Sequence, residues 1–367
     1  SAVAEGCILC AEKTLRDGKK DQAAQLYDAV RTADVPKPRL VEATRGAILA
    51  RGIDGVPLLV EQLASSDRMM VAIGLTTARE LTDPGVSKKL LAAFTKIPAD
   101  RQAMLILAIA DRGDAEAMPA ILDAAKTGPV PVRVAAIEVL ACLGNATCLP
   151  VLLNAATEEN VDVAQAAKVT LQKLPGDGVD KKLVARLDSA KGKERLVIIE
   201  LIGQRRIDRV PPLLTALDDS DAQVRAAALL ALGEVVRFNN LPVLIDRAIN
   251  SSHAEDTPVA LQALHAACLR MPGRETCSQK LADAFVKAPE PAQIVILETL
   301  TEMGGTKALQ TVVQAAKSDD SQIQDTATRL LGTWMTVDAG PPLLELAKTP
   351  QYPYQVRALR GYIRLVR

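Results

Sequence analysis

The residues of this sequence best suited to chemistry are six cysteines, which fall into three close pairs. An even number of cysteines in local pairs is typical of disulfides, and disulfides persist in oxidising compartments. We therefore expect a periplasmic or secreted protein, with a cytoplasmic protein carrying free thiols as the alternative. The pairs are Cys7 and Cys10, Cys142 and Cys148, and Cys268 and Cys277.

The second and third pairs occupy equivalent places in the chain. In each pair the first cysteine comes near the end of one helical segment and the second near the start of the next. A disulfide at such a turn would join two helix ends that are already close. We predict the disulfides Cys142–Cys148 and Cys268–Cys277, and the alternative is four buried free cysteines.

Cys7 and Cys10 form a C-x-x-C motif in a helical segment. They are interpreted as a local disulfide or as two free thiols on one helix face. A redox motif needs a strand before the helix, which is missing here. Covalent haem attachment needs a histidine directly after the second cysteine, where Ala11 stands, and zinc needs four ligands. We predict no metal site and no cofactor.

The sequence contains no recognisable catalytic constellation. Its two histidines, His253 and His265, are 12 residues apart and lack the spacing of a helical metal pair. No nucleophile elbow, P-loop or dinucleotide-binding glycine motif is present. We therefore predict a protein that is not an enzyme and name no catalytic residue.

The strongest surface signal lies in the last segment of the chain. Four arginines recur there at steps of 3, 4 and 3 residues, which places them along one side of a helix beside an apolar stripe. Tyr and Arg are enriched at binding hot spots. We predict an interface to a protein partner or to a further C-terminal domain, and a solvated edge helix is the alternative. The predicted interface residues are Tyr352, Tyr354, Arg357, Arg360, Tyr362 and Arg364; Arg367 completes the basic stripe, and Val356, Leu359, Ile363 and Val366 form the apolar one.

The composition indicates which elements must position these residues. The chain has 367 residues, of which 49% are hydrophobic and only 2% aromatic. This profile favours closely packed helices over a β-sandwich. Lys+Arg and Asp+Glu balance at 44 each, which argues against nucleic acid as a partner. No apolar run is long enough for membrane insertion. The helical pattern reaches Arg367 without a cap, so we expect the natural protein to continue.

The chain is built from repeats of about 31 residues. Prolines at positions 57, 119, 150, 211 and 242 are separated by 62, 31, 61 and 31 residues. Each unit is interpreted as a short helix A, with proline in its first turn, followed by a longer helix B. We predict an all-α fold, an α-α superhelix of about ten helical hairpins over residues 36–367. Residues 1–35 are expected to form an N-terminal capping hairpin with Gly18 at its turn.

The clearest helix B begins after Asp221, which is expected to cap it. Gly233, Gly144, Gly304 and Gly332 stand where we expect left-handed residues to end such helices.

The repeat pattern resembles the short HEAT-like repeat, of the type seen in phycobilin-lyase-related proteins. It is carried by the proline series and by Val132-Arg133, Val224-Arg225 and Val356-Arg357. The resemblance also implies that the Asp before helix B and the Arg within it form a structural ladder along the solenoid, so Asp221 and Arg225, four residues apart, are expected to pair in that way. The segment Gln22–Tyr27 resembles a tetratricopeptide-type helix.

The resemblance implies a non-catalytic protein-binding scaffold. We expect it to be the repeat region of a larger secreted multidomain bacterial protein. Two alternatives remain: an enzyme of HEAT-like fold (a chromophore lyase or an alkylpurine DNA glycosylase), and a structural spacer for an attached sugar-active domain.

Overall fold

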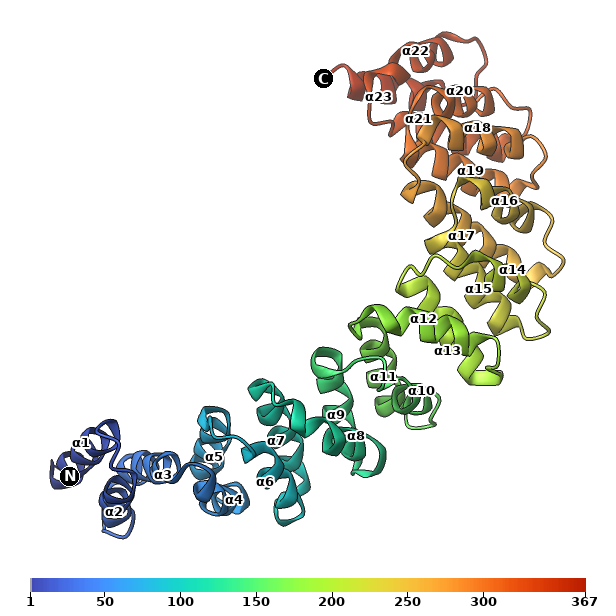
Figure 1. Ribbon diagram of the computed structural model, residues 1–367. Helices are drawn as coiled ribbons and strands as arrows, with labels where there is room; N and C mark the ends of the chain where they lie inside the picture. The colour runs from blue at the N-terminus through green and yellow to red at the C-terminus, as the bar shows by residue number, and fades with distance from the viewer. Residues whose placement is uncertain (1) are drawn as a thin grey trace. The chain divides into compact units, whose positions relative to one another are not determined.

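The computed structural model describes residues 2–367, which contain helices and no β-strand. By internal contacts the chain divides into two compact units, one up to Lys182 and one from Leu183 to Arg367, and the boundary falls within α12 (Asp177–Leu187). Within each unit, successive helices stack in the order of the sequence (Figure 1). The predicted all-α fold is confirmed.

The α-helices of the first unit are α1 (Ala2–Arg16), α2 (Lys20–Arg31), α3 (Lys37–Arg51), α4 (Val56–Ala64), α5 (Arg68–Glu80), α6 (Val86–Ala92), α7 (Ala99–Arg112), α8 (Met118–Thr127), α9 (Val130–Leu143), α10 (Leu149–Ala156) and α11 (Val161–Lys173). Those of the second unit are α13 (Gly192–Gln204), α14 (Val210–Ala216), α15 (Ala222–Val235), α16 (Leu241–Ile249), α17 (Thr257–Arg270), α18 (Arg274–Phe285), α19 (Glu290–Met303), α20 (Thr306–Ala315), α21 (Ser321–Gly332), α22 (Gly340–Lys348) and α23 (Gln355–Leu365). Short 3-10 turns precede several of them.

The helices alternate between the two predicted classes. The even-numbered helices from α4 onward are helix A, and several begin with proline in their first two positions, as in α10 and α16. The odd-numbered helices from α3 onward are helix B. Each helix B packs on the next helix B of its unit, from α3 to α11 and from α13 to α23. This nearest-neighbour stacking defines an α-α solenoid, as predicted.

Helix B is started by side-chain caps where the sequence supplies them. Asp67, Asn160, Asp221 and Asp320 each accept a hydrogen bond from a backbone N–H in the first turn of the following helix. The cap predicted at Asp221 is therefore confirmed, with a distance of 2.8 Å to the backbone nitrogen of Gln223. Each cap satisfies a donor that the helix itself leaves without a partner.

Of the four predicted left-handed glycines, Gly304 is confirmed and the other three are wrong. Gly144 follows α9 with an extended backbone at a φ of −75°, and Gly332 is the last residue of α21. Gly304 follows α19 with a φ of +67°. Gly233 instead lies inside α15, which continues to Val235. A Cβ at Gly233 would lie 2.9 Å from the carbonyl oxygen of Ala263 on α17. This glycine therefore allows two B helices to pack closely, a requirement that the pattern along one helix does not reveal.

The N-terminal hairpin consists of α1 and α2, with Gly18 at a φ of +79° between them. Ile8, Tyr27 and Val30 share one buried cluster with Ala43 and Ala47 of α3. The hairpin therefore packs directly on the first helix B and continues its core.

Candidate functional site

The predicted interface lies on and around α23. Ala358 and Gly361 are its buried residues, and it packs against α21 and α22. A Cβ at Gly361 would lie 2.8 Å from the Cα of Gly332, so these two helices touch at their backbones. The opposite side of α23 is open: Val356 is 65% exposed, Leu359 45%, Ile363 40% and Val366 63%.

Two of the predicted interface tyrosines hold α23 in place. The hydroxyl of Tyr352 donates to the carbonyl oxygen of Ala316 at 3.0 Å and also contacts the hydroxyl of Thr328. Burial raises the pKa of Tyr352. The hydroxyl of Tyr354 donates to the carbonyl oxygen of Ser321 at 3.3 Å. Both tyrosines therefore join the segment before α23 to the preceding repeat.

Two of the predicted arginines also point toward that repeat. Arg357 forms an ion pair with Asp325 at 2.5 Å, and its guanidinium lies 5.0 Å from the centre of the Tyr354 ring. Arg364 donates to the carbonyl oxygens of Gly332 at 2.8 Å and Trp334 at 2.5 Å. A cation at these carbonyls also complements the helix dipole of α21.

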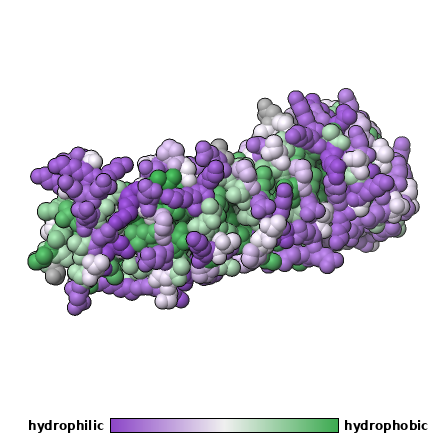
Figure 2. Space-filling model, turned by 60° about the horizontal axis from the view of Figure 1, so that its bottom comes forward, coloured by the Kyte–Doolittle hydropathy of each residue, from purple (hydrophilic) through white to green (hydrophobic). Residues whose placement is uncertain are grey.

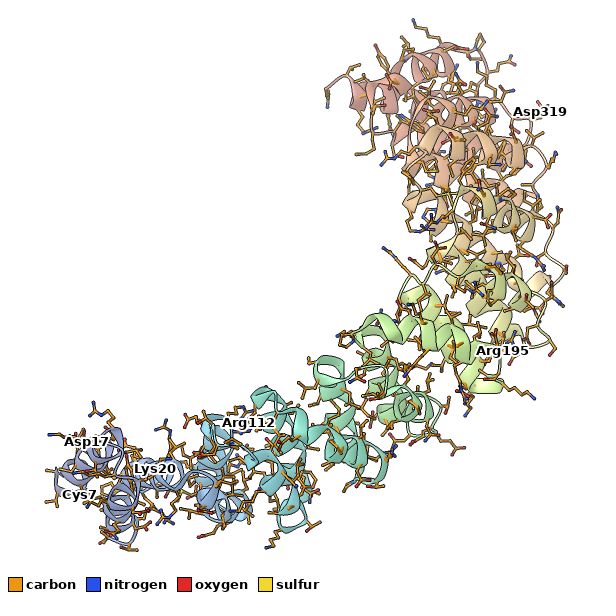
Figure 3. The ribbon with its side chains drawn as sticks, in the orientation of Figure 1. Cys7, Asp17, Lys20, Arg112, Arg195 and Asp319 are labelled. Carbon is orange, nitrogen blue, oxygen red and sulfur yellow. The ribbon has the colours of Figure 1, made fainter. Side chains whose placement is uncertain are left out.

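The contact made by Arg364 recurs in other repeats. Arg112 of α7, labelled in Figure 3, donates to the carbonyl oxygen of Ala78 at 3.0 Å and to that of Leu81, at the end of α5. Arg270 of α17 donates to the carbonyl oxygens of Gly233 and Val236, at the end of α15. An arginine late in helix B thus caps the preceding helix B, which is a structural role.

The remaining predicted residues are differently placed. Arg360 is exposed, and Tyr362 is half-buried with its ring against Gly340. Arg360 and Arg367 flank the open apolar stripe, whereas Arg357 and Arg364 bind the neighbouring repeat. We define the α23 face as Val356, Leu359, Arg360, Ile363, Val366 and Arg367.

Arg225 takes part in the expected ladder along the solenoid, but its partner is the Asp before the next helix B and not Asp221. Arg225 is 3% exposed and forms an ion pair with Asp256 at 2.7 Å and with Glu255 at 3.0 Å, both in the short 3-10 turn directly before helix B (α17) of the next repeat. It also donates to the carbonyl oxygen of Asp219 at 3.1 Å. Asp221 is occupied as the helix cap, so its carboxylate serves the backbone instead.

A groove that the repeat pattern does not predict lies on the B helices of the first unit. It has a volume of about 580 Å³ between α9 and α11 and is lined by apolar side chains with Glu138 and Asp162 among them. Val130 is 36% exposed, Val161 77% and Val169 37%. Figure 2, which shows one face of the molecule, has hydrophobic surface over the first unit at its left, interrupted by hydrophilic side chains. Each valine fits a regular repeat, so only their exposure distinguishes them.

All six cysteines are free thiols in this structure. Cys142 is exposed whereas Cys148 is buried, and Cys7 is half-buried whereas Cys10 is exposed. Cys268 and Cys277 are both fully buried. None of the three predicted disulfides is therefore formed in it, and only the third pair brings two buried sulfurs together.

The histidines make local contacts. His265 Nδ1 lies 2.9 Å from the hydroxyl of Thr299, on the neighbouring α19. Within residues 2–367 no group of three or more His, Cys, Asp or Glu side chains is arranged to hold a metal ion. A search of the same residues finds no helix with the length and apolar character needed to span a membrane.

One repeat of this architecture matches a known family model. The HEAT repeat model matches residues 210–238, which span α14 and α15. A search of curated proteins finds no match. The crystal structure of Kap121p is similar over 95% of this chain and 54% of that one, at 12% identity and a TM-score of 0.47.

Two further solved structures are similar over most of this chain. Kap95p, from its complex with RanGDP, matches 97% of this chain and 52% of its own, at 14% identity and a TM-score of 0.45. Human deoxyhypusine hydroxylase in complex with glycerol matches 85% of this chain and 97% of its own, at 16% identity and a TM-score of 0.31. This chain therefore spans about half the length of the two Kap proteins. The stacked B helices define an α-α solenoid, and one of its units, residues 210–238, matches the HEAT repeat.

Proposed function

We propose that this protein is a non-catalytic scaffold that binds a protein partner on the α23 face. The observation that carries the proposal is the exposure of four large apolar side chains along one side of a single helix. Grouped apolar surface of this kind marks interaction sites, whereas single exposed apolar residues need no explanation.

The fold indicates what shape of partner fits this face. In the second unit, α19 packs on α21 and α21 packs on α23. Each of these contacts places one helix along the apolar side of the next. The α23 face presents the same kind of surface without a helix on it. We infer that the partner contributes an amphipathic helix.

The charges on the face indicate the chemistry of that helix. Arg360 and Arg367 flank the apolar stripe, and neither has an ion-pair partner within residues 2–367. An amphipathic helix with acidic residues beside its apolar side would complement both. The helix belongs to a separate protein or to a further domain of a larger secreted protein. The secreted location is part of this proposal and rests on the even number of cysteines in local pairs, of which Cys268 and Cys277 are both buried at one turn.

The test compares two double variants at apolar positions of matched exposure, one pair on the α23 face and one pair elsewhere. Leu359→Glu with Ile363→Glu changes two α23 residues that are 45% and 40% exposed. Leu230→Glu with Leu269→Glu changes residues that are 43% and 42% exposed, on α15 and α17. A photoreactive side chain at position 359 or 230 of the full chain then reports which surface contacts a partner in an extract of the native organism.

We expect crosslinks from position 359 to an acidic amphipathic helix, and few from position 230. The α23 variant should abolish capture of that partner, while the control variant should retain it. Arg360→Glu with Arg367→Glu should weaken capture most at low salt, because the attraction is electrostatic. Capture that survives the α23 variant would overturn the proposal, and the absence of any crosslink would favour a structural spacer.

A further inference from the structure

A second feature lies at the turn between α17 and α18 and is independent of the α23 face. Cys268 stands in the last turn of α17, and Cys277 stands at the fourth position of α18. Only the residues from Met271 to Gly273 separate the two helices. Both cysteines are 0% exposed, and their thiols lie within hydrogen-bonding reach of each other.

The other two cysteine pairs lack this arrangement. Cys7 and Cys10 are three residues apart inside α1, where their Cβ atoms would be about 5–6 Å apart. A disulfide needs Cβ atoms about 3.5–4.5 Å apart, so this pair would have to distort the helix. Cys142 is exposed and Cys148 is buried, so those two side chains occupy different environments.

We propose that Cys268 and Cys277 form a redox-active dithiol that closes to a disulfide and staples α17 to α18. Two helix ends joined by a three-residue turn are close neighbours, and a disulfide requires Cβ atoms about 3.5–4.5 Å apart. The oxidant is a disulfide of low molecular mass or of another protein, reached when the first turn of α18 opens locally.

The place of Cys277 in the first turn of α18 favours its thiolate, because the N-terminus of a helix stabilises negative charge. The hydrogen bond from Cys268 lowers the pKa of the Cys277 thiol, and the charge of Lys280 acts in the same direction, against the effect of burial. The hydrogen bond to Cys277 and burial raise the pKa of Cys268. Cys277 therefore supplies the thiolate, which is the nucleophile in disulfide exchange.

The exchange has two balanced steps. The Cys277 thiolate attacks one sulfur of the donor disulfide, forms a mixed disulfide and releases one donor thiolate. Cys268 then loses its proton and attacks the Cys277 sulfur, which releases the second donor thiolate. Two protein thiols are oxidised to one disulfide, and the donor disulfide is reduced to two thiols after protonation.

The staple would also fix the joint to the following repeat. Glu275, two residues before Cys277, accepts hydrogen bonds from the backbone N–H groups of Thr306 at 2.7 Å and Lys307 at 3.1 Å. These groups begin α20 and have no partner inside their helix. Anchoring the first turn of α18 to α17 therefore limits the motion of the turn that caps α20.

The test uses the full chain and detects the disulfide after tryptic digestion. Trypsin places the two cysteines in separate peptides, so only a disulfide can hold these peptides together. Cleavage after Arg247, Arg270, Arg274 and Lys280 leaves Cys268 in the peptide Ala248–Arg270 and Cys277 in the peptide Glu275–Lys280. The unfolded chain is refolded in a glutathione redox buffer, and its free thiols are then alkylated in denaturant. The masses of the tryptic peptides are measured by mass spectrometry. Refolding removes the need for the oxidant to reach buried thiols.

We expect the two peptides to appear joined, with loss of their alkylated forms, and reductant should restore both. Cys142→Ser should leave this link unchanged, whereas Cys268→Ser should remove it. Backbone amides of the first turns of α18 and α20 should exchange more slowly in the oxidised chain. Alkylation of both peptides after oxidative refolding, or a link from Cys277 to another cysteine, would overturn the proposal.

Discussion

The first helices of the first unit and the last helix of the second unit end their stacks in different ways. At the N-terminus, α1 and α2 cover α3, and Tyr27 is buried between them at 3% exposure. Val3 and Leu9 are the large apolar residues that α1 leaves exposed, and their spacing of six places them on different sides of the helix. At the C-terminus, α23 is an ordinary helix B whose open side carries a continuous apolar stripe.

The difference shows that a single repeat cannot bury its own apolar surface. A helix B has an apolar side toward each neighbour, so a stack needs either a dedicated cover or another helix at each end. The hairpin of α1 and α2 is such a cover. The α23 face has none within residues 2–367, which is why it is the strongest candidate interface.

The largest expected effect tests whether the hairpin is an integral cover. Tyr27→Ala should remove the main aromatic contact between α2 and α3 and cost about 3–5 kcal/mol, because a large cavity would be left. Hydrogen exchange should then rise in α1 to α3 and stay unchanged in the second unit. Unchanged protection of α1 would show that the hairpin is held by other contacts.

A pair of glycine substitutions compares the close helix contacts at the two ends. A Cβ at Gly46 of α3 would overlap the ring of Tyr27, and a Cβ at Gly361 would press on the backbone of Gly332. Each glycine-to-alanine change should cost about 1–3 kcal/mol through overpacking. Chemical denaturation measures the loss. Gly6→Ala, where no atom lies within 4 Å of the added carbon, is the control and should cost nothing comparable.

A smaller effect is expected from the hydroxyl that fixes α23. Tyr352→Phe keeps the ring but leaves the carbonyl of Ala316 without its donor at 3.0 Å. A buried group without its partner costs about 1–3 kcal/mol. Thermal melting should detect the loss, and exchange should rise in α23. Equal stability of the variant would mean that ring packing alone positions α23.

The smallest effect concerns the ion pairs that hold the hairpin. Burial raises the pKa of Asp28, but hydrogen bonds from Arg51 and Arg31 outweigh it and bring the pKa below the ordinary value of 3.8. Asp28 therefore stabilises the fold above its ordinary pKa, and the contribution is lost as pH falls through its lower native value.

Asp28→Asn should cost less than about 1 kcal/mol at neutral pH, because the group is partly exposed and screened by solvent. Melting curves of variant and parent should converge as the pH is lowered below the native pKa of Asp28. A difference that persists in strong acid would assign the effect to packing.

Much of the fold could be predicted from the sequence, because its signals are local. The proline series, the Asp caps and the apolar spacing each act within one or two turns of a helix. They predicted the alternation of helices A and B and the hairpin around Gly18. The positive φ of Gly304 follows from the same local rules. The role of Gly233 does not follow from them, because it depends on the close packing of α15 against α17.

The candidate site was only partly predictable. Spacing placed Arg357, Arg360 and Arg364 on one helix, but it did not distinguish the arginine that remains free from the two that bind the preceding repeat. Tyr352 was predicted as an interface residue, yet its hydroxyl bonds to Ala316, 36 residues away. No periodicity within α23 contains that information.

The sequence by itself therefore determined the helices, their order and the repeat, because hydrogen bonding and apolar periodicity within each helix are fixed by neighbouring residues. Only the tertiary structure decided which side chains bind a neighbouring repeat and which remain exposed to solvent. It turned Arg364 onto the carbonyls of α21 and left Leu359 and Ile363 without a covering helix. Those outcomes depend on the neighbouring repeat, because burial and pairing are properties of contacts between helices.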